Sequence, residues 1–326
     1  MTSRRVFICT LAGGLLAAPR GAEAQQAGKV YRIGFLGGAS QSGYVAQIEA
    51  LRLGLQDRGY VEGRNITIEY RWAEGKYDRL PTLAAELVRL NVDIIITQGT
   101  PAALAAKRAT PTIPIVMAIV GDPVEAGIVK SVSQPGGNVT GSAFFYGELN
   151  AKRLEMIKAA LPSLTRVAVL MNPDNPAMVS VLRIMEERAQ ALNVKLRPIG
   201  VRRLDELETA VALAKEQTEA LTIIDEGLLI TNAGRIAELA MRSRLPSIGF
   251  REYVIAGGLI AYGVDFLDIW RGSMVLVDKI LKGTKPADLP IQQATRFELI
   301  INIKTAKALR LTIPQSFLLR ADQVIE

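Results

Sequence analysis

The sequence contains no histidine, and its one cysteine, Cys9, lies close to the amino terminus. Without histidine the chain cannot form a Ser-His-Asp triad or a histidine-ligated metal site, and one cysteine cannot form a zinc-cysteine cluster. The sequence also has neither a Gly-x-Gly-x-x-Gly loop for a dinucleotide nor a Walker-type phosphate loop. We therefore expect no enzyme activity, no cofactor and no metal ion.

The charge of the chain is positive but dispersed. Its 326 residues include 39 basic and 32 acidic side chains, which gives a formal net charge of +7, and 49% of the residues are hydrophobic. No stripe of basic residues follows the spacing of a phosphate backbone, so we expect no nucleic-acid partner. The composition is that of a folded protein long enough for two lobes.

Residues 1–24 have the pattern of a signal peptide. Arg4 and Arg5 precede a short apolar run at 6–18, and Ala-Glu-Ala at 22–24 is the small-x-small pattern that signal peptidase recognises. The run is shorter than the roughly 20 apolar residues that span a bilayer. We therefore predict export to the periplasm and a mature chain that begins near Gln25. The paired arginines are compatible with a twin-arginine signal and also with a Sec signal.

From residue 29 onward, short β-rich runs alternate with longer segments of helical period, which is typical of βαβ units and parallel sheets. In the first half we expect strands at 30–36, 66–70, 93–97 and 115–118 and helices at 45–58, 80–90 and 101–108. In the second half we expect strands at 166–171, 195–199, 220–225 and 246–249 and helices at 149–160, 177–192, 204–217 and 235–244. The pattern predicts an α/β fold with two doubly wound parallel-sheet lobes.

The elements after residue 257 are too few for a third domain. They must complete the two sheets, so the chain has to cross between the lobes more than once and form a multi-crossing hinge. We predict an N-terminal lobe of residues 28–143 plus 263–292 and a C-terminal lobe of residues 144–262 plus 293–326.

Three predicted strands are each followed by a helix-capping residue and a proline: Thr100-Pro101, Asp122-Pro123 and Asn172-Pro173. Ligands of open α/β sheets bind beyond the carboxyl ends of the strands, where helix N-termini attract anions. We therefore predict that helix N-termini capped by Thr100 and Asp122 bind the anionic end of a ligand, although helix capping alone would explain each pair.

Carboxylates follow two other strands. Asp225 and Asp265 are candidates to bind a ligand ammonium group by charge-assisted hydrogen bonds, whereas Glu226 is interpreted as a solvated loop acid. Tyr44 and Tyr253 adjoin strand ends and could cover an aromatic ligand. The predicted ligand-binding residues are Ser40, Tyr44, Gly99, Thr100, Ala102, Gly121, Asp122, Asn172, Asn175, Asp225, Tyr253 and Asp265.

Several segments together resemble a known family. They are 121–124 (Gly-Asp-Pro-Val), 135–141 (Pro-Gly-Gly-Asn-Val-Thr-Gly), 262–265 (Tyr-Gly-Val-Asp), 301–309 (Ile-Asn-Ile-Lys-Thr-Ala-Lys-Ala-Leu), and the ending from 313 to 326. In these segments the sequence resembles ABC-transporter substrate-binding proteins of the tryptophan/tyrosine transport type, which have the type I periplasmic-binding fold. The resemblance implies two lobes joined by three crossing segments that close on a small molecule.

We therefore expect a monomeric, exported solute-binding protein that delivers its ligand to a membrane permease and an ATPase. The ligand is expected to be an amino acid, aromatic or related, or a small carboxylate. A ligand of another class, such as a sugar or an amide, remains the alternative.

Overall fold

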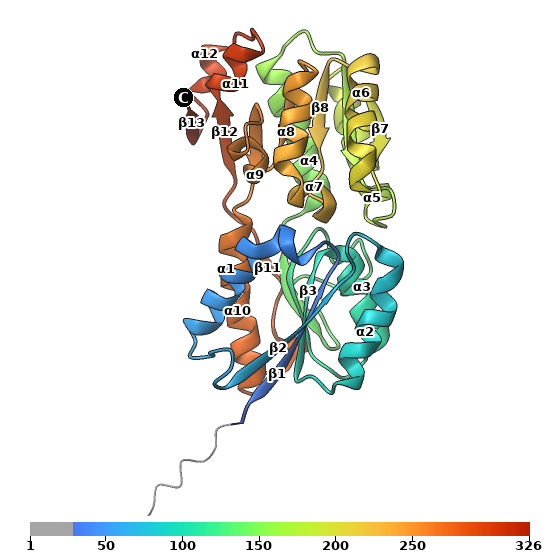
Figure 1. The fold of residues 1–326 in the computed structure, drawn as a ribbon, viewed down its shortest axis with the longest axis vertical. Coiled ribbons are helices and arrows are strands. Elements are labelled where there is room, and N and C mark those ends of the chain that lie inside the picture. Colours follow the sequence, from blue (N-terminus) through green and yellow to red (C-terminus); the bar gives the residue numbers. More distant parts are fainter. Residues whose placement is uncertain (1–28) are drawn as a thin grey trace, which may run out of the picture.

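Buried apolar runs form the central strands of two separate sheets. The computed structural model describes residues 29–326, so the predicted signal peptide lies outside the described residues. Each sheet is covered by helices and forms its own lobe, and the two lobes are stacked along the long axis of the molecule (Figure 1). The predicted α/β fold with two lobes built on parallel sheets is confirmed.

The sheet of the first lobe is parallel throughout. Its central strands β3 (Ile94–Gln98) and β4 (Ile115–Val120) are buried along their whole length because helices cover both faces. Its strands, in spatial order, are β11 (Gln292–Gln293), β5 (Val139–Ala143), β4 (Ile115–Val120), β3 (Ile94–Gln98), β1 (Tyr31–Gly37) and β2 (Ile66–Trp72). The helices that pack in this lobe are α1 (Val45–Gln56), α2 (Leu80–Arg89), α3 (Gly99–Ala109) and α10 (Phe266–Leu281).

The sheet of the second lobe is parallel except where β12 (Glu298–Asn302) runs antiparallel to β10 (Ile260–Gly263). Its strands, in spatial order, are β13 (Gln323–Ile325), β12 (Glu298–Asn302), β10 (Ile260–Gly263), β9 (Ser247–Gly249), β8 (Ala220–Ile223), β6 (Arg166–Met171) and β7 (Lys195–Gly200). Its helices are α4 (Tyr146–Ala160), α5 (Met178–Ala191), α6 (Leu207–Gln217), α7 (Gly227–Thr231), α8 (Ala233–Arg242), α9 (Arg251–Ile255), α11 (Ile303–Ala308) and α12 (Gln315–Leu318).

The chain passes between the lobes after β5, after β10 and after β11. The passage after β11 explains why β12 is antiparallel to β10. The chain leaves the second lobe at the end of β10 and returns to it at the start of β12, so the two strands run in opposite directions from the hinge. The predicted lobe limits place Gly263 in the first lobe and Gln293 in the second, whereas the two residues end β10 and β11 and so belong to the opposite sheets.

Short 3-10 helices extend the ends of several elements, among them η1 (Gln41–Tyr44) before α1 and η2 (Tyr77–Arg79) before α2. In the part of the chain that the structure describes, no helix combines the length and the hydrophobicity that a bilayer crossing requires.

Candidate ligand-binding site

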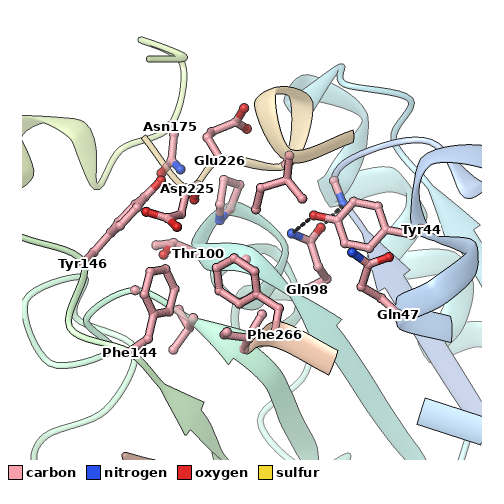
Figure 2. A pocket seen from close by; sticks show the side chains of 18 of the residues that line it. Tyr44, Gln47, Gln98, Thr100, Phe144, Tyr146, Asn175, Asp225, Glu226 and Phe266 are labelled. Carbon is pink, nitrogen blue, oxygen red and sulfur yellow. Dashed lines mark hydrogen bonds between the residues drawn. The ribbon is translucent and has the colours of Figure 1, made fainter. Parts of the chain in front are cut away.

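A cavity lies between the two lobes, at the carboxyl ends of strands from both sheets (Figure 2). Its lining encloses about 570 Å³ of empty space, part of which is open to solvent. The first-lobe sheet and its helices contribute Gly38, Tyr44, Gln47, Tyr77, Gln98, Gly99, Thr100, Pro101, Ile119, Val120, Gly121, Phe266 and Trp270. The second lobe and the passage into it contribute Phe144, Tyr146, Asn175, Asp225, Glu226, Gly227 and Ile230.

Aromatic rings form much of the cavity wall. Phe144 lies between Tyr146 and Phe266, with ring centroids 5.2 and 5.5 Å away, and Tyr44 packs on Trp270 with centroids 5.7 Å apart. The lining contains no lysine or arginine. An anionic ligand group would therefore have to be bound by neutral donors, whereas a cationic group would meet acidic side chains.

The carboxylate of Asp225 is already paired inside the second lobe. Arg153 of α4 donates from Nη1 to Oδ2 at 2.5 Å and from Nη2 to Oδ1 at 2.8 Å, and neither side chain is more than 1% exposed. Because the guanidinium neutralises this carboxylate, the prediction that Asp225 supplies the charge for a ligand ammonium group is not supported by its surroundings.

Glu226 is the acid in the cavity without a cationic partner among the described residues. Its carboxylate accepts hydrogen bonds from the backbone N–H of Leu228 at 2.9 Å, and from the hydroxyl of Tyr77, which reaches across from the first lobe. Burial raises the pKa of this carboxyl to about 7. The interpretation of Glu226 as a solvated loop acid is therefore wrong: its side chain caps α7 and is buried at the cavity.

Two buried side chains organise the first-lobe side of the cavity. The backbone N–H of Gly38 donates to Oε1 of Gln98 at 3.3 Å, and Nε2 of Gln98 donates to the hydroxyl of Tyr44 at 2.9 Å. Burial, with Glu226 and Glu252 nearby, raises the pKa of the Tyr44 hydroxyl well above its usual range. Tyr44 therefore keeps its proton at neutral pH.

Helix α3 starts next to these residues and points its N-terminus at the cavity. Gln98 is the residue before the helix, and Gly99, with φ of +78°, is its first residue. Thr100 consequently lies inside the first turn, and the prediction that it caps the helix is wrong. Its position still places it on the cavity lining (Figure 2).

Some of the predicted ligand-binding residues line this cavity. They are Tyr44, Gly99, Thr100, Gly121, Asn175 and Asp225.

Other predicted residues are buried away from the cavity. Ala102 packs inside the core of the first lobe, where its methyl group is fully buried. Tyr253 is also fully buried and shares a hydrogen bond with the hydroxyl of Ser247. Asn172 is 1% exposed, and its side chain accepts from the backbone N–H of Asp174, which stabilises the turn before α5.

The remaining predicted residues lie at the rims of the lobes. Ser40 lines a separate groove on the outer side of the interlobe contact. Asp122 accepts from the N–H groups of Val124 and Glu125 in a turn that does not continue into a helix, so it offers no helix N-terminus to a ligand. Asp265 caps α10 through the N–H groups of its first turn and faces another groove near the hinge.

Several lining residues were not predicted from the sequence. Gln98 was detectable because it directly follows the expected strand at 93–97, whereas Phe144 follows β5, for which no strand had been predicted. Phe266 and Trp270 were not detectable, because they belong to a helix that returns to the first lobe after the second passage between lobes. Tyr77 was hidden in a short 3-10 helix with no distinctive sequence pattern.

These features define a two-lobed ligand-binding protein with the type I periplasmic-binding fold. The family model for the ABC transporter substrate binding protein matches residues 37–325, and the chain belongs to this family.

Individual relatives agree with this assignment. The tyrosine-binding protein of Clostridioides difficile (strain R20291) is 29% identical over 256 residues, which are 78% of this chain and 74% of the relative. A conserved domain protein from Vibrio cholerae has a crystal structure that is 29% identical, covers 91% of this chain and 100% of its own, and superposes with a TM-score of 0.85. The ABC domain from Streptococcus pneumoniae in complex with L-Trp is 26% identical, covers 90% and 99%, and has a TM-score of 0.82.

Proposed function

We propose that this protein is the exported solute-binding component of an ABC importer and that it captures an aromatic L-amino acid between its lobes. The observation that carries the proposal is the composition of the cavity: aromatic walls, an unpaired buried acid and no basic side chain among its lining residues. Two relatives support it, since one is named for tyrosine binding and the other was solved with L-Trp.

Each part of an amino acid has a matching surface in this cavity. The ammonium group would bind Glu226, because Asp225 is neutralised by Arg153. The carboxylate would bind on the first-lobe side, where Gly99 and Thr100 present the N-terminal turn of an 11-residue helix. The side-chain ring would pack against the aromatic walls.

A ligand held in this way touches both lobes. Glu226 lies on the second lobe and α3 on the first, so a zwitterion would connect them and stabilise the closed arrangement. A carboxylate without an ammonium group would leave Glu226 buried without a cationic partner, and a neutral sugar would supply no cation for it either. The amino acid is therefore favoured over the small carboxylate and the sugar.

The test is a thermal-shift screen of the chain from residue 25 onward with the twenty amino acids, benzoate-type carboxylates and sugars, followed by calorimetry of each hit. An aromatic L-amino acid is expected to raise the midpoint by mass action, with about 2.7 kcal/mol of stabilisation at one hundred times Kd. A sugar or a plain carboxylate that binds while all aromatic amino acids fail would contradict the proposal.

Export and delivery need their own measurements. N-terminal sequencing of the protein from the periplasmic fraction should find a chain that begins near Gln25, and a retained Met1 in the cytosol would contradict export. Replacement of Arg4 and Arg5 by lysine blocks export only if the twin-arginine route is used. We further propose that the protein works as a monomer with a membrane permease and an ATPase.

A further inference from the structure

We infer that Gln98 is a positioning residue that makes Tyr44 a hydrogen-bond donor to the ligand, so that the first-lobe side of the cavity selects a ligand acceptor, the carboxylate of the amino acid. The inference deepens the proposed function and rests on it for the identity of the ligand. Its structural basis is the direction of two buried hydrogen bonds.

The direction of these bonds follows from the chemistry of the partners. A backbone N–H can only donate, so the oxygen of the Gln98 amide must face Gly38, and the NH₂ group must then face Tyr44. The Tyr44 oxygen therefore accepts from Gln98. Its own proton remains available, because no acceptor for it is found among residues 29–326.

The other two tyrosines on the cavity use their protons differently. Tyr146 donates to the backbone carbonyl of Asp225 at 2.5 Å, and Tyr77 donates to the carboxylate of Glu226. Their oxygens can then only accept from a ligand. Of the three cavity tyrosines, Tyr44 alone has a phenolic proton to offer.

The cavity therefore presents hydrogen-bond donors on the side of the first lobe and hydrogen-bond acceptors on the side of the second lobe. Tyr44 adjoins the start of α3 through Gln98, so its O–H adds to the donors of Gly99 and Thr100 on the first lobe. Glu226 and the oxygen of Tyr146 supply acceptors at the second lobe (Figure 2). The oxygen of Tyr77, which reaches Glu226 from the first lobe, adds a further acceptor there. A zwitterion fits this arrangement in one orientation, carboxylate to the first lobe and ammonium to the second.

The experiment reverses the direction of the hydrogen bond between residue 98 and the Tyr44 hydroxyl and leaves the tyrosine in place. Gln98→Glu has nearly the same shape, but at pH 9 an ionised carboxylate accepts from Gly38 and from Tyr44 alike, which turns the Tyr44 proton away from the ligand. Affinity for L-tryptophan and L-tyrosine is measured by calorimetry for the wild type, Tyr44→Phe, Gln98→Glu and the double variant. Gln47→Glu, with and without Tyr44→Phe, adds the same charge to the same cavity without touching Gln98.

The expected result is a loss of about tenfold to one hundredfold in affinity for Tyr44→Phe in the wild-type and Gln47→Glu backgrounds, since a hydrogen bond to a charged acceptor is lost. In the Gln98→Glu background, Tyr44→Phe should cost little further affinity. At pH 6 the protonated carboxyl introduced by Gln98→Glu can donate as the amide does. The ratio of the Kd of this variant to that of the wild type at the same pH should therefore move back toward one, and this comparison cancels the protonation of Glu226 that both proteins share. A full Tyr44→Phe penalty in Gln98→Glu at pH 9, or no penalty in the wild type, overturns the inference.

A ligand-free measurement separates this inference from the proposed function. In ¹H–¹⁵N spectra the side-chain NH₂ signal of Gln98 should shift in Tyr44→Phe, whereas that of Gln47 should move less. If neither amino acid binds the wild type, the proposed ligand is wrong while this signal still tests the arrangement. An unmoved Gln98 NH₂ signal overturns the hydrogen-bond direction itself.

Discussion

Arg153 and Asp225 form a buried ion pair that joins the ligand cavity to the hinge. Besides the two contacts with the carboxylate, the guanidinium donates to the carbonyl of Tyr262 at 2.7 Å and to that of Ile223 at 3.1 Å. Arg153 thereby holds together the ends of β8 and β10. β10 is the strand from which the chain leaves the second lobe, so this side chain fixes the cavity wall and the start of a crossing segment at once.

Loss of Arg153 should destabilise the protein strongly. Arg153→Met keeps much of the volume but leaves Asp225 as a buried charge without a partner, and removal of one member of such a pair costs about 3 to 5 kcal/mol. The free energy of unfolding is measured in urea. The double variant Arg153→Met, Asp225→Asn should recover part of the loss because the buried charge is gone. Arg166→Met, which breaks an exposed ion pair with Glu219, is the control and should change the free energy of unfolding little. An equal loss of stability in Arg153→Met and Arg166→Met would contradict the prediction.

Glu226 should make stability fall as the pH rises toward neutrality. Its pKa is raised from 4.5 to about 7 in the folded protein, so between these pH values the folded state binds more protons than the unfolded chain. The stabilisation is complete below about pH 4.5 and is lost as the pH rises to about 7, with an amplitude on the order of 3 kcal/mol.

Urea unfolding at several pH values checks this dependence, and Glu226→Gln should make it shallower. Burial also raises the pKa of Glu252 to about 7, so a slope of the same sign remains until Glu252→Gln is added. A slope that is unchanged in Glu226→Gln would show that this carboxyl titrates normally.

The ammonium subsite gives Glu226→Gln a second consequence. The variant keeps the shape of the side chain but loses the charge, so affinity for an aromatic amino acid should fall by about 1.5 to 3 kcal/mol, roughly tenfold to one hundredfold. Calorimetry in two buffers of different ionisation enthalpy should also show proton release on binding by the wild type near pH 7, because the ammonium favours the ionised carboxylate. Equal proton release in the variant would contradict the assignment.

The sequence predicted the side of the sheets on which the cavity lies, because β3, β4 and β6 were recognisable and their ends are followed by polar residues and prolines. It did not predict where each helix starts. Gly99 adopts a positive φ and lets α3 begin one residue before Thr100, while the residues after Asp122 form only a turn. The pairing of Arg153 with Asp225, 72 positions apart, depends on tertiary packing that periodicity does not encode.

The correction at the start of α3 changes what Thr100→Ala should do. Because Thr100 is not the helix cap, the loss of about 1 kcal/mol expected for a removed cap should not occur. A contact between its hydroxyl and the ligand carboxylate would instead appear as weaker binding at nearly normal stability. Asp265→Ala should show the opposite: it removes a real cap on α10 at about 1 kcal/mol, and leaves affinity near that of the wild type. Urea unfolding measures the stability of both variants, and calorimetry measures their affinity for the ligand. Reduced affinity in Asp265→Ala with normal affinity in Thr100→Ala would contradict the assignment of Thr100 to the ligand and of Asp265 to the helix cap.

Gly43 should control how closely the lobes approach. A Cβ added at Gly43 in η1 would lie 2.5 Å from Cβ of Thr231 in α7, and closer still to its Cγ2, and α7 belongs to the opposite lobe. Gly43→Ala should therefore hold the lobes apart and give a larger radius of gyration by small-angle X-ray scattering in the presence of ligand, with weaker binding because Glu226 and α3 no longer reach the same molecule. Thr231→Gly removes both clashing atoms and should restore closure in the Gly43→Ala background. Gly272→Ala, where an added methyl meets nothing within 4 Å inside α10, is the matched control and should leave both the radius and the affinity unchanged. If Gly43→Ala closes on ligand as the wild type does, the contact between Gly43 and Thr231 does not limit closure.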